Sequence, residues 1–166
     1  MLYVFTDASY ALDADRFGIG ASVRSEAGEE IAVCAAAIGC PSWCTSSLAE
    51  RHAALEALRF ARAIGEPVEL RTDDQALALV LRGEATHSRE SVAADALRQY
   101  VALLREEVAR GVVVRWIPRG ENGRANALAR WALRSAGPLP AGPGELVPVR
   151  GQWRRRWPAA RTASAA

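Results

Sequence analysis

The chain has 166 residues, of which 50% are hydrophobic and 24% are charged. This length is enough for one domain with its own core and too short for a second full domain. The sequence holds no run of eighteen apolar residues, and its apolar start reaches Asp7 too early for a signal peptide. We therefore expect a cytoplasmic protein with no membrane partner.

The positive charges are all arginine, 21 in number, and they exceed the acidic residues by only two. A GC-rich genome explains this bias, because its codons favour Arg, Ala and Gly over Lys. Recognition of phosphate also explains it, since a guanidinium group fits phosphate oxygens and stacks on bases. Composition leaves both explanations open.

Three cysteines occur, Cys34, Cys40 and Cys44. An odd number excludes a complete disulfide framework. No further cysteine or histidine pair follows at the spacing of a zinc site. We expect free, half-buried thiols in a reducing compartment.

Strands and helices alternate along the chain in an α/β order. We expect strands at 2–6, 17–23, 30–38, 68–72 and 112–117, and helices at 46–61, 75–81, 91–109 and 122–135. The turn at 25–28 predicts an antiparallel hairpin, and the helical crossover between the strands 2–6 and 68–72 predicts that they pair in parallel. Either Ser46 or Ser47 can cap the helix that follows.

Gly18 and Gly20 alternate on one face of the second expected strand. Because glycine has no side chain, they leave room for another backbone or a ligand to approach.

The composition changes at Gly137, where a segment rich in proline and glycine begins. We therefore expect a domain at 1–136 and a linker with a C-terminal tail at 137–166. In the tail, Trp153 and Trp157 enclose three consecutive arginines. Such a segment either packs on the domain or is disordered, or it binds phosphates and stacks on bases.

Three acidic residues follow or begin expected elements at one edge of the sheet: Asp7, Glu50 and Asp73. If the strands before Asp7 and Asp73 are adjacent and parallel, both carboxylates leave the sheet at the same edge, and Glu50 on the crossover helix faces it. Carboxylate oxygens suit Mg²⁺ or Mn²⁺. Two such ions catalyse phosphodiester hydrolysis by in-line displacement.

Short sequence motifs add to this pattern of acidic residues. The segments at 5–9, 18–20, 46–58, 70–75 and 116–129 occur in one order and spacing, and with them the chain resembles the type 1 ribonuclease H family over residues 1 to about 135. The resemblance implies an α/β fold with a five-stranded mixed sheet, three antiparallel strands followed by two parallel ones in the order 3-2-1-4-5, flanked by helices. It also implies that the RNA strand of an RNA/DNA hybrid is cut with two divalent ions, Mg²⁺ or Mn²⁺, leaving 3′-hydroxyl and 5′-phosphate ends.

The resemblance assigns catalysis and metal binding to Asp7, Glu50 and Asp73, while the fourth acid of the family aligns with Asn126. An amide oxygen can contact a metal ion but brings no charge, so we expect weaker metal binding and a preference for Mn²⁺. Asp74 and Glu121 are candidate substitutes for the missing acid. Each also suits the start of a helix, which is the reading we favour.

The expected substrate contacts are Ser46, Ser47, Gln75, Arg119 and Asn122. The two serines align with positions where relatives contact the minor groove and the 2′-hydroxyl groups. The loop around Arg119 lacks the histidine that many relatives place there. His52 and His87 lie elsewhere, and we expect structural or solvated roles for them.

The main hypothesis is a ribonuclease H, a metal-dependent endonuclease that acts on RNA/DNA hybrids as a monomer, with double-stranded RNA as a further expected partner. The alternative is a nucleic-acid-binding module with weak or lost catalysis, which the amide at Asn126 favours. A proofreading exonuclease would need an Asp-x-Glu pair where the sequence has Asp7-Ala-Ser9. Transposases and integrases place their glutamate last, which argues against them.

Overall fold

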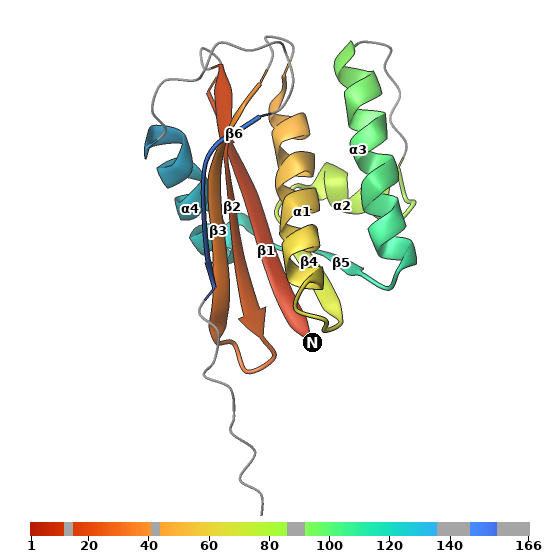
Figure 1. The fold of residues 1–166 in the computed structure, drawn as a ribbon. Helices are drawn as coiled ribbons and strands as arrows, with labels where there is room; N and C mark the ends of the chain where they lie inside the picture. The colour runs from red at the N-terminus through yellow and green to blue at the C-terminus, as the bar shows by residue number, and fades with distance from the viewer. Residues whose placement is uncertain (12–14, 41–43, 86–91, 136–146, 156–166) are drawn as a thin grey trace, which may run out of the picture.

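The fold is described from a computed structural model, shown in Figure 1. It covers residues 1–11, 15–40, 44–85, 92–135 and 147–155. No helix in these ranges is long and apolar enough to cross a membrane.

A single mixed sheet forms the centre of the fold. Its strands are β1 (Leu2–Tyr10), β2 (Arg16–Ser25), β3 (Glu30–Gly39), β4 (Val68–Thr72), β5 (Val113–Trp116) and β6 (Val147–Arg155), in the spatial order β5-β4-β1-β2-β3-β6. β1, β2 and β3 pair antiparallel, whereas β4 pairs in parallel with both β1 and β5. The predicted five-stranded order 3-2-1-4-5 is confirmed, and β6 extends it by one strand at the β3 edge.

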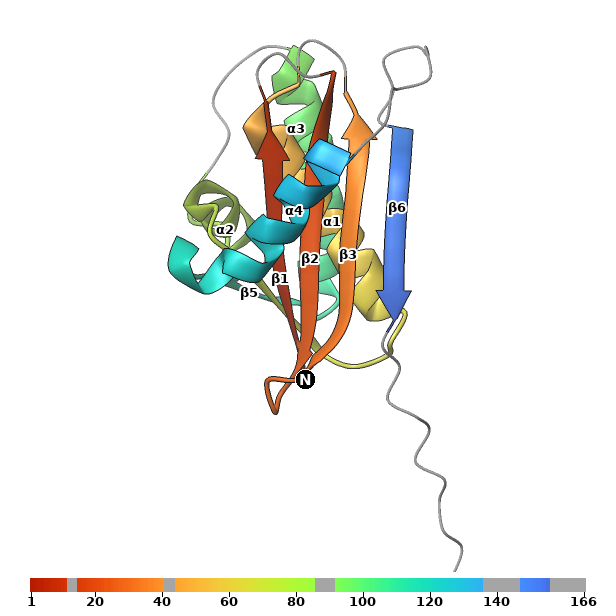
Figure 2. The ribbon, with the colours of Figure 1, turned by 90° about the vertical axis from the view of Figure 1, so that its left-hand side faces the viewer.

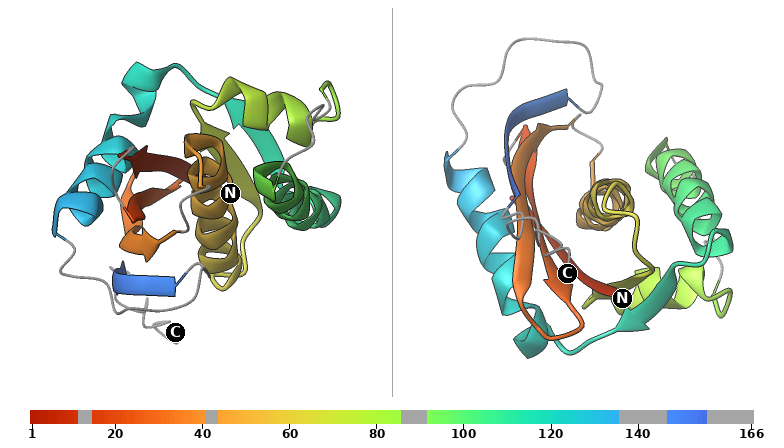
Figure 3. Two further views of the ribbon diagram at one scale, coloured as in Figure 1. Left: turned by 90° about the horizontal axis from the view of Figure 1, so that it is seen from above. Right: turned by 60° about the horizontal axis from the view of Figure 1, so that its bottom comes forward.

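Helices cover both faces of the sheet. They are α1 (Ser46–Arg62), α2 (Gln75–Leu81), α3 (Val92–Ala109) and α4 (Gly123–Ser135), with a 3₁₀ turn, η1 (Arg119–Asn122), before α4. Figures 1 and 2 show α4 lying across one face and α1 with α3 on the other. In Figure 3 the sheet curves around α1, which is therefore the most enclosed helix. α1 carries Glu50, so this enclosure brings that residue to the sheet.

The main core lies between α1 and the sheet. Leu48, Leu55 and Leu58 of α1 are buried there against β-strand residues such as Val4 and Leu70. These leucines recur at helical spacing, which is why this segment forms an amphipathic helix. A smaller apolar cluster on the α4 side contains Phe5, Ile117 and Ala125.

The two glycines of β2 allow α4 to approach the sheet closely. A Cβ atom at Gly20 would lie 2.2 Å from the carbonyl oxygen of Ala125, and one at Gly18 would lie 2.0 Å from that of Ala129. Real Cβ atoms never approach backbone oxygens so closely, so only glycine fits at both positions. The space expected above these glycines is thus filled by the α4 backbone, which fixes the height of α4 over the sheet.

Two elements differ from the prediction. β1 continues to Tyr10, although a loop was expected from Ala8, because β2 provides hydrogen-bonding partners along that whole length. β6 was not predicted and pairs antiparallel with β3. The expected linker at 137–144 and the side chains of the Trp153–Trp157 tail lie outside the described residues. The domain boundary at 136 therefore stays a prediction.

Candidate active site

Two of the predicted carboxylates lie side by side on the sheet. In the parallel pairing of β1 and β4, Thr6 stands opposite Thr72, and each threonine is followed by an aspartate, Asp7 within β1 and Asp73 directly after β4. The sequence predicted Asp7 just after the end of its strand. In the structure it lies inside β1, opposite Gly20 on β2. Its position against two neighbouring strands leaves it only 4% exposed.

Glu50 reaches the same place from α1. Thr45 caps this helix, with its hydroxyl oxygen accepting from the Leu48 amide at 3.2 Å. The expected cap was Ser46 or Ser47. The helix instead begins at Ser46, one residue earlier than a Ser46 cap and two residues earlier than a Ser47 cap would give, so both serines are helical. This start places Glu50 in the second turn, where its carboxyl group hydrogen-bonds that of Asp7.

The two carboxyl groups resist ionisation together. Burial is the largest cause that raises the pKa of both Asp7 and Glu50, and the charge of Asp73 adds to it for each. Their mutual hydrogen bond lowers the pKa of Asp7 and raises that of Glu50, so the pKa of Glu50 is the more strongly raised of the two. The charge of Arg119 partly offsets the effect at Asp7. A cation in this place would favour the ionised form of both groups.

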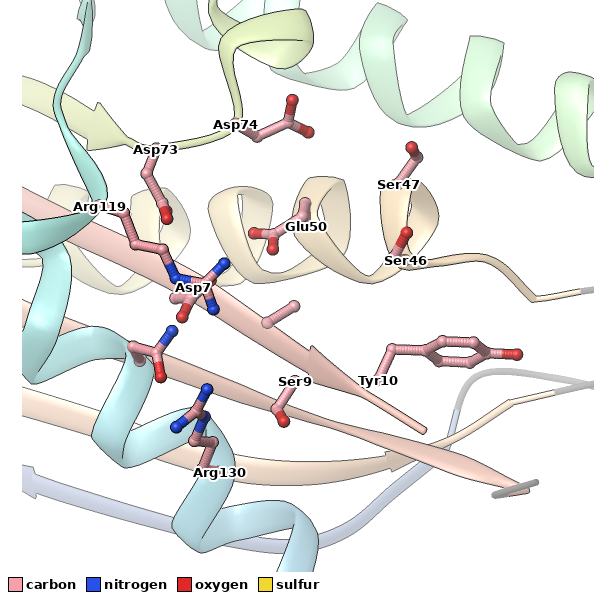
Figure 4. Close-up of a pocket in the computed structure, with 12 residues that line it drawn as sticks. Asp7, Ser9, Tyr10, Ser46, Ser47, Glu50, Asp73, Asp74, Arg119 and Arg130 are labelled. Atoms are coloured by element: carbon pink, nitrogen blue, oxygen red, sulfur yellow. The ribbon is translucent and has the colours of Figure 1, made fainter. Parts of the chain in front are cut away.

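These side chains line an open cleft of about 520 Å³, seen in Figure 4. Its walls come from β1, α1, α4, η1 and the β4–α2 junction. The lining residues are Asp7, Ala8, Ser9, Tyr10, Ser46, Ser47, Glu50, Asp73, Asp74, Arg119, Asn126 and Arg130. All four residues assigned to catalysis from the sequence, Asn126 included, are therefore brought together.

Asn122 donates a hydrogen bond to Asp73. It is 1% exposed, and its Nδ2 donates to the Asp73 Oδ1 at 2.6 Å and to the Thr6 carbonyl at 2.7 Å. One amide thus ties the last helix region to the adjacent strands β1 and β4. The sequence placed Asn122 among the substrate contacts, whereas the structure shows its amide hydrogens used inside the protein.

Asp74 points away from the cleft centre in Figure 4 and is engaged elsewhere. Its Oδ1 accepts from the Leu77 amide at 3.0 Å, which caps α2, and its Oδ2 lies 3.6 Å from Nη1 of the buried Arg51. The expected cap is confirmed. Glu121, the other candidate substitute, is exposed in η1 and does not line the cleft.

The carboxylate oxygens of Asp7 and Glu50 are ligands of the kind that a hard divalent cation prefers. Asp7 Oδ2 and Glu50 Oε2 are buried and have no hydrogen-bond partner, a costly state that a cation relieves. Among the described residues, no three His, Cys, Asp or Glu side chains already stand as a complete ligand group. The site thus offers a carboxylate pair with Asp73 beside it and a neutral amide at Asn126, and it leaves room in the open cleft for oxygen ligands from a substrate.

The predicted substrate residues fall into two groups. Ser46, Ser47 and Arg119 line the cleft, whereas the exposed Gln75, the first residue of α2, does not. His52 does not line the cleft. The ring nitrogen Nδ1 of His52 is 2.7 Å from the Tyr100 hydroxyl, joining α1 to α3, which fits the expected structural role. His87 lies outside the described residues.

Sequence reasoning missed three polar residues that line the cleft: Ser9, Tyr10 and Arg130. The first two were assigned to a loop, so their place beside the carboxylates was not visible. Arg130 follows Asn126 by four residues and therefore shares its helix face, a signal that the spacing alone contained.

Fold and site together define an α/β protein of the ribonuclease H type. The family model described as reverse transcriptase-like matches residues 5–132, and the chain belongs to that family. A search of curated proteins finds no match.

Solved structures agree with this class. Ribonuclease H1 from the archaeon Halobacterium salinarum is 27% identical, with a TM-score of 0.72 over 81% of this chain and 98% of its own. LC11 ribonuclease H1, isolated from compost by a metagenomic approach and solved with an RNA/DNA hybrid, is 24% identical, with a TM-score of 0.67 over 81% and 97%. The N-terminal ribonuclease H domain of a Mycobacterium tuberculosis protein is 17% identical, with a TM-score of 0.68 over 81% and 94%. The predicted resemblance to type 1 ribonuclease H is confirmed, and with it the place of the chain among the ribonuclease H enzymes.

Proposed function

We propose that the protein is a divalent-metal-dependent endonuclease that hydrolyses the RNA strand of RNA/DNA hybrids, leaving 3′-hydroxyl and 5′-phosphate ends. One observation carries the proposal: Asp7, Glu50 and Asp73 converge from three elements in an open cleft, and two of their buried oxygens have no partner in the protein. Buried oxygens without a partner are uncommon in proteins, and a bound cation would satisfy these two.

Asp7, Glu50, Asp73 and the amide of Asn126 would hold two ions, Mg²⁺ or Mn²⁺. When bound, such ions activate water and stabilise the charge that develops on the phosphate. The protein itself contributes position. Asn122 fixes the direction of Asp73 through a 2.6 Å hydrogen bond, while the sheet carries Asp7 on β1 and the helix α1 carries Glu50.

Substrate recognition rests on the cleft walls. Ser46 and Ser47 are free of the capping role that Thr45 performs, so their hydroxyls can contact the 2′-hydroxyl groups that distinguish RNA from DNA. The LC11 enzyme was solved with an RNA/DNA hybrid, which supports the same substrate class here.

The second candidate function is a nucleic-acid-binding module with weak catalysis, favoured by the neutral side chain of Asn126. Incubating the protein with a labelled RNA/DNA hybrid in Mg²⁺ and in Mn²⁺ separates the two. The proposal expects RNA fragments in at least one metal. Binding without fragments in either metal would establish the second candidate instead.

A further inference from the structure

Most arginines in the described part of the chain form ion pairs with Asp or Glu. Those that do are Arg16, Arg51, Arg59, Arg62, Arg71, Arg82, Arg98, Arg110, Arg115 and Arg124. Arg24 lies over the Phe5 ring and Arg105 donates to the Val80 carbonyl, and neither forms an ion pair with the described residues. Arg119, Arg130 and Arg134 also form none with these residues, and all three are exposed. Their charges are therefore not neutralised by a neighbouring carboxylate within salt-bridge distance.

These three arginines lie in one groove. It has a volume of about 450 Å³ and is lined by Arg119, Gly123, Asn126, Ala127, Arg130 and Arg134, with no acidic residue among them. Arg119, Asn126 and Arg130 also line the carboxylate cleft, so groove and cleft are continuous. Figure 4 shows Arg119 and Arg130 on the side of the cleft that leads to α4.

The spacing of the groove suits a polymer of phosphates. Arg130 and Arg134 are one helical turn apart, which is about 6 Å along the axis and comparable with the distance between successive phosphates of one strand. Gly123 and Ala127 occupy the same face with minimal side chains, so the floor of the groove stays open. Guanidinium groups in such a row bind successive phosphates without reading the bases.

We propose that this groove binds backbone phosphates of the strand that is cut, beyond the bond that is hydrolysed. The inference rests on the proposed function, because it takes the carboxylate cleft as the place of that bond. The strand that enters the cleft continues into the groove, passing Arg119 and Arg130 first and Arg134 last. Arg134 is thus the residue that belongs to the groove and not to the cleft.

The first test measures affinity without cleavage. Fluorescence anisotropy follows an 18-base-pair labelled RNA/DNA hybrid binding to the full chain in EDTA, over a series of salt concentrations. Arg134→Ala should weaken binding roughly fivefold. It should also make the slope of log affinity against log salt less steep by about one, the change expected for the loss of one phosphate contact. The matched control is Arg98→Ala, which also removes one exposed arginine, but from an ion pair with Asp95 on α3, across the sheet. Equal behaviour of the two variants would overturn the proposal.

The second test locates the contact. Hybrids carry a single uncharged methylphosphonate linkage at successive positions of either strand. The wild type should lose affinity at one or two linkages of the RNA strand on one side of the cut, and Arg134→Ala should show no further loss there. Loss at DNA linkages, or additive losses, would contradict the assignment. If the wild type binds no hybrid at all, the proposed function fails first, so the two failures are distinguishable.

Discussion

Asn122 and Asp73 are joined by a 2.6 Å hydrogen bond between an almost fully buried amide and a carboxylate of the cleft. Asp73 follows β4 directly, while Asn122 ends the 3₁₀ turn before α4. Because the same amide also donates to the Thr6 carbonyl, the bond fixes Asp73 relative to the β1 strand that carries Asp7. Asn122 is therefore a positioning residue for the carboxylate cluster.

Replacing Asn122 with Ala should lower both stability and activity. The substitution leaves the Thr6 carbonyl and one Asp73 oxygen without a donor, which costs about 1–3 kcal/mol. Urea unfolding measures the first effect. Hybrid cleavage at saturating metal measures the second, and we expect kcat to fall more than KM rises, since the reacting geometry is disturbed. Asn122→Asp should be worse, because it places a second carboxylate against Asp73. A fully active Asn122→Ala protein would contradict the positioning role.

Restoring a carboxylate at Asn126 should strengthen metal binding. Asn126→Asp adds one negative charge to the cleft, and a divalent ion gains affinity with each added carboxylate. Isothermal titration calorimetry should show roughly tenfold tighter binding of Mn²⁺. The metal concentration for half-maximal cleavage should fall in parallel. If neither quantity moves, Asn126 does not face a metal ion.

The stability of the metal-free protein should fall as the pH rises from about 7 to 9. Burial raises the pKa of Glu50 far above its ordinary value of 4.5, so the folded state holds a proton that the unfolded state has already released. The free energy of unfolding therefore falls with pH from the ordinary pKa up to the raised pKa of Glu50, and it levels off above the raised pKa. The window avoids interference from His52, whose pKa is lowered by burial and which is neutral throughout.

Thermal unfolding in EDTA at several pH values tests this dependence. Glu50→Gln should flatten the slope, because the amide cannot ionise. Excess Mg²⁺ should also reduce it, since the ion binds the ionised carboxylates. A slope that is unchanged in Glu50→Gln would assign the dependence to another group.

The close approach of α4 to β2 predicts a strong effect of one added methyl group. Gly20→Ala would place a Cβ atom 2.2 Å from the Ala125 carbonyl oxygen, a backbone atom that moves only with the helix. We expect a loss of about 2–3 kcal/mol in unfolding free energy, with reduced cleavage because Asn126 moves too. Gly120→Ala is the control, since nothing lies within 4 Å of its Cβ position. A Gly20→Ala protein as stable as this control would contradict the packing.

The site residues that the sequence predicted correctly share one property. Their positions follow from where a strand or helix ends and from which strands pair. Asp7 and Asp73 were placed together because parallel pairing of β1 and β4 leaves no other arrangement. The burial of Asn122 could not be predicted in this way, because it depends on how η1 packs against β1. The burial of Arg51 could not be predicted either, because its pairing with Asp74 requires the three-dimensional approach of α1 and α2.

The most direct test of the central claim compares the wild type with Asp73→Asn on a hybrid whose RNA strand is labelled at its 5′ end. The asparagine keeps an oxygen that accepts from Asn122, so the fold should persist, and circular dichroism checks this. The account predicts RNA fragments with 3′-hydroxyl ends from the wild type in Mg²⁺ or Mn²⁺, and a loss of at least a hundredfold in rate for Asp73→Asn, as expected when a group that acts on the transition state is removed. Equal rates for the two proteins, or no cleavage by the wild type in either metal, would contradict it.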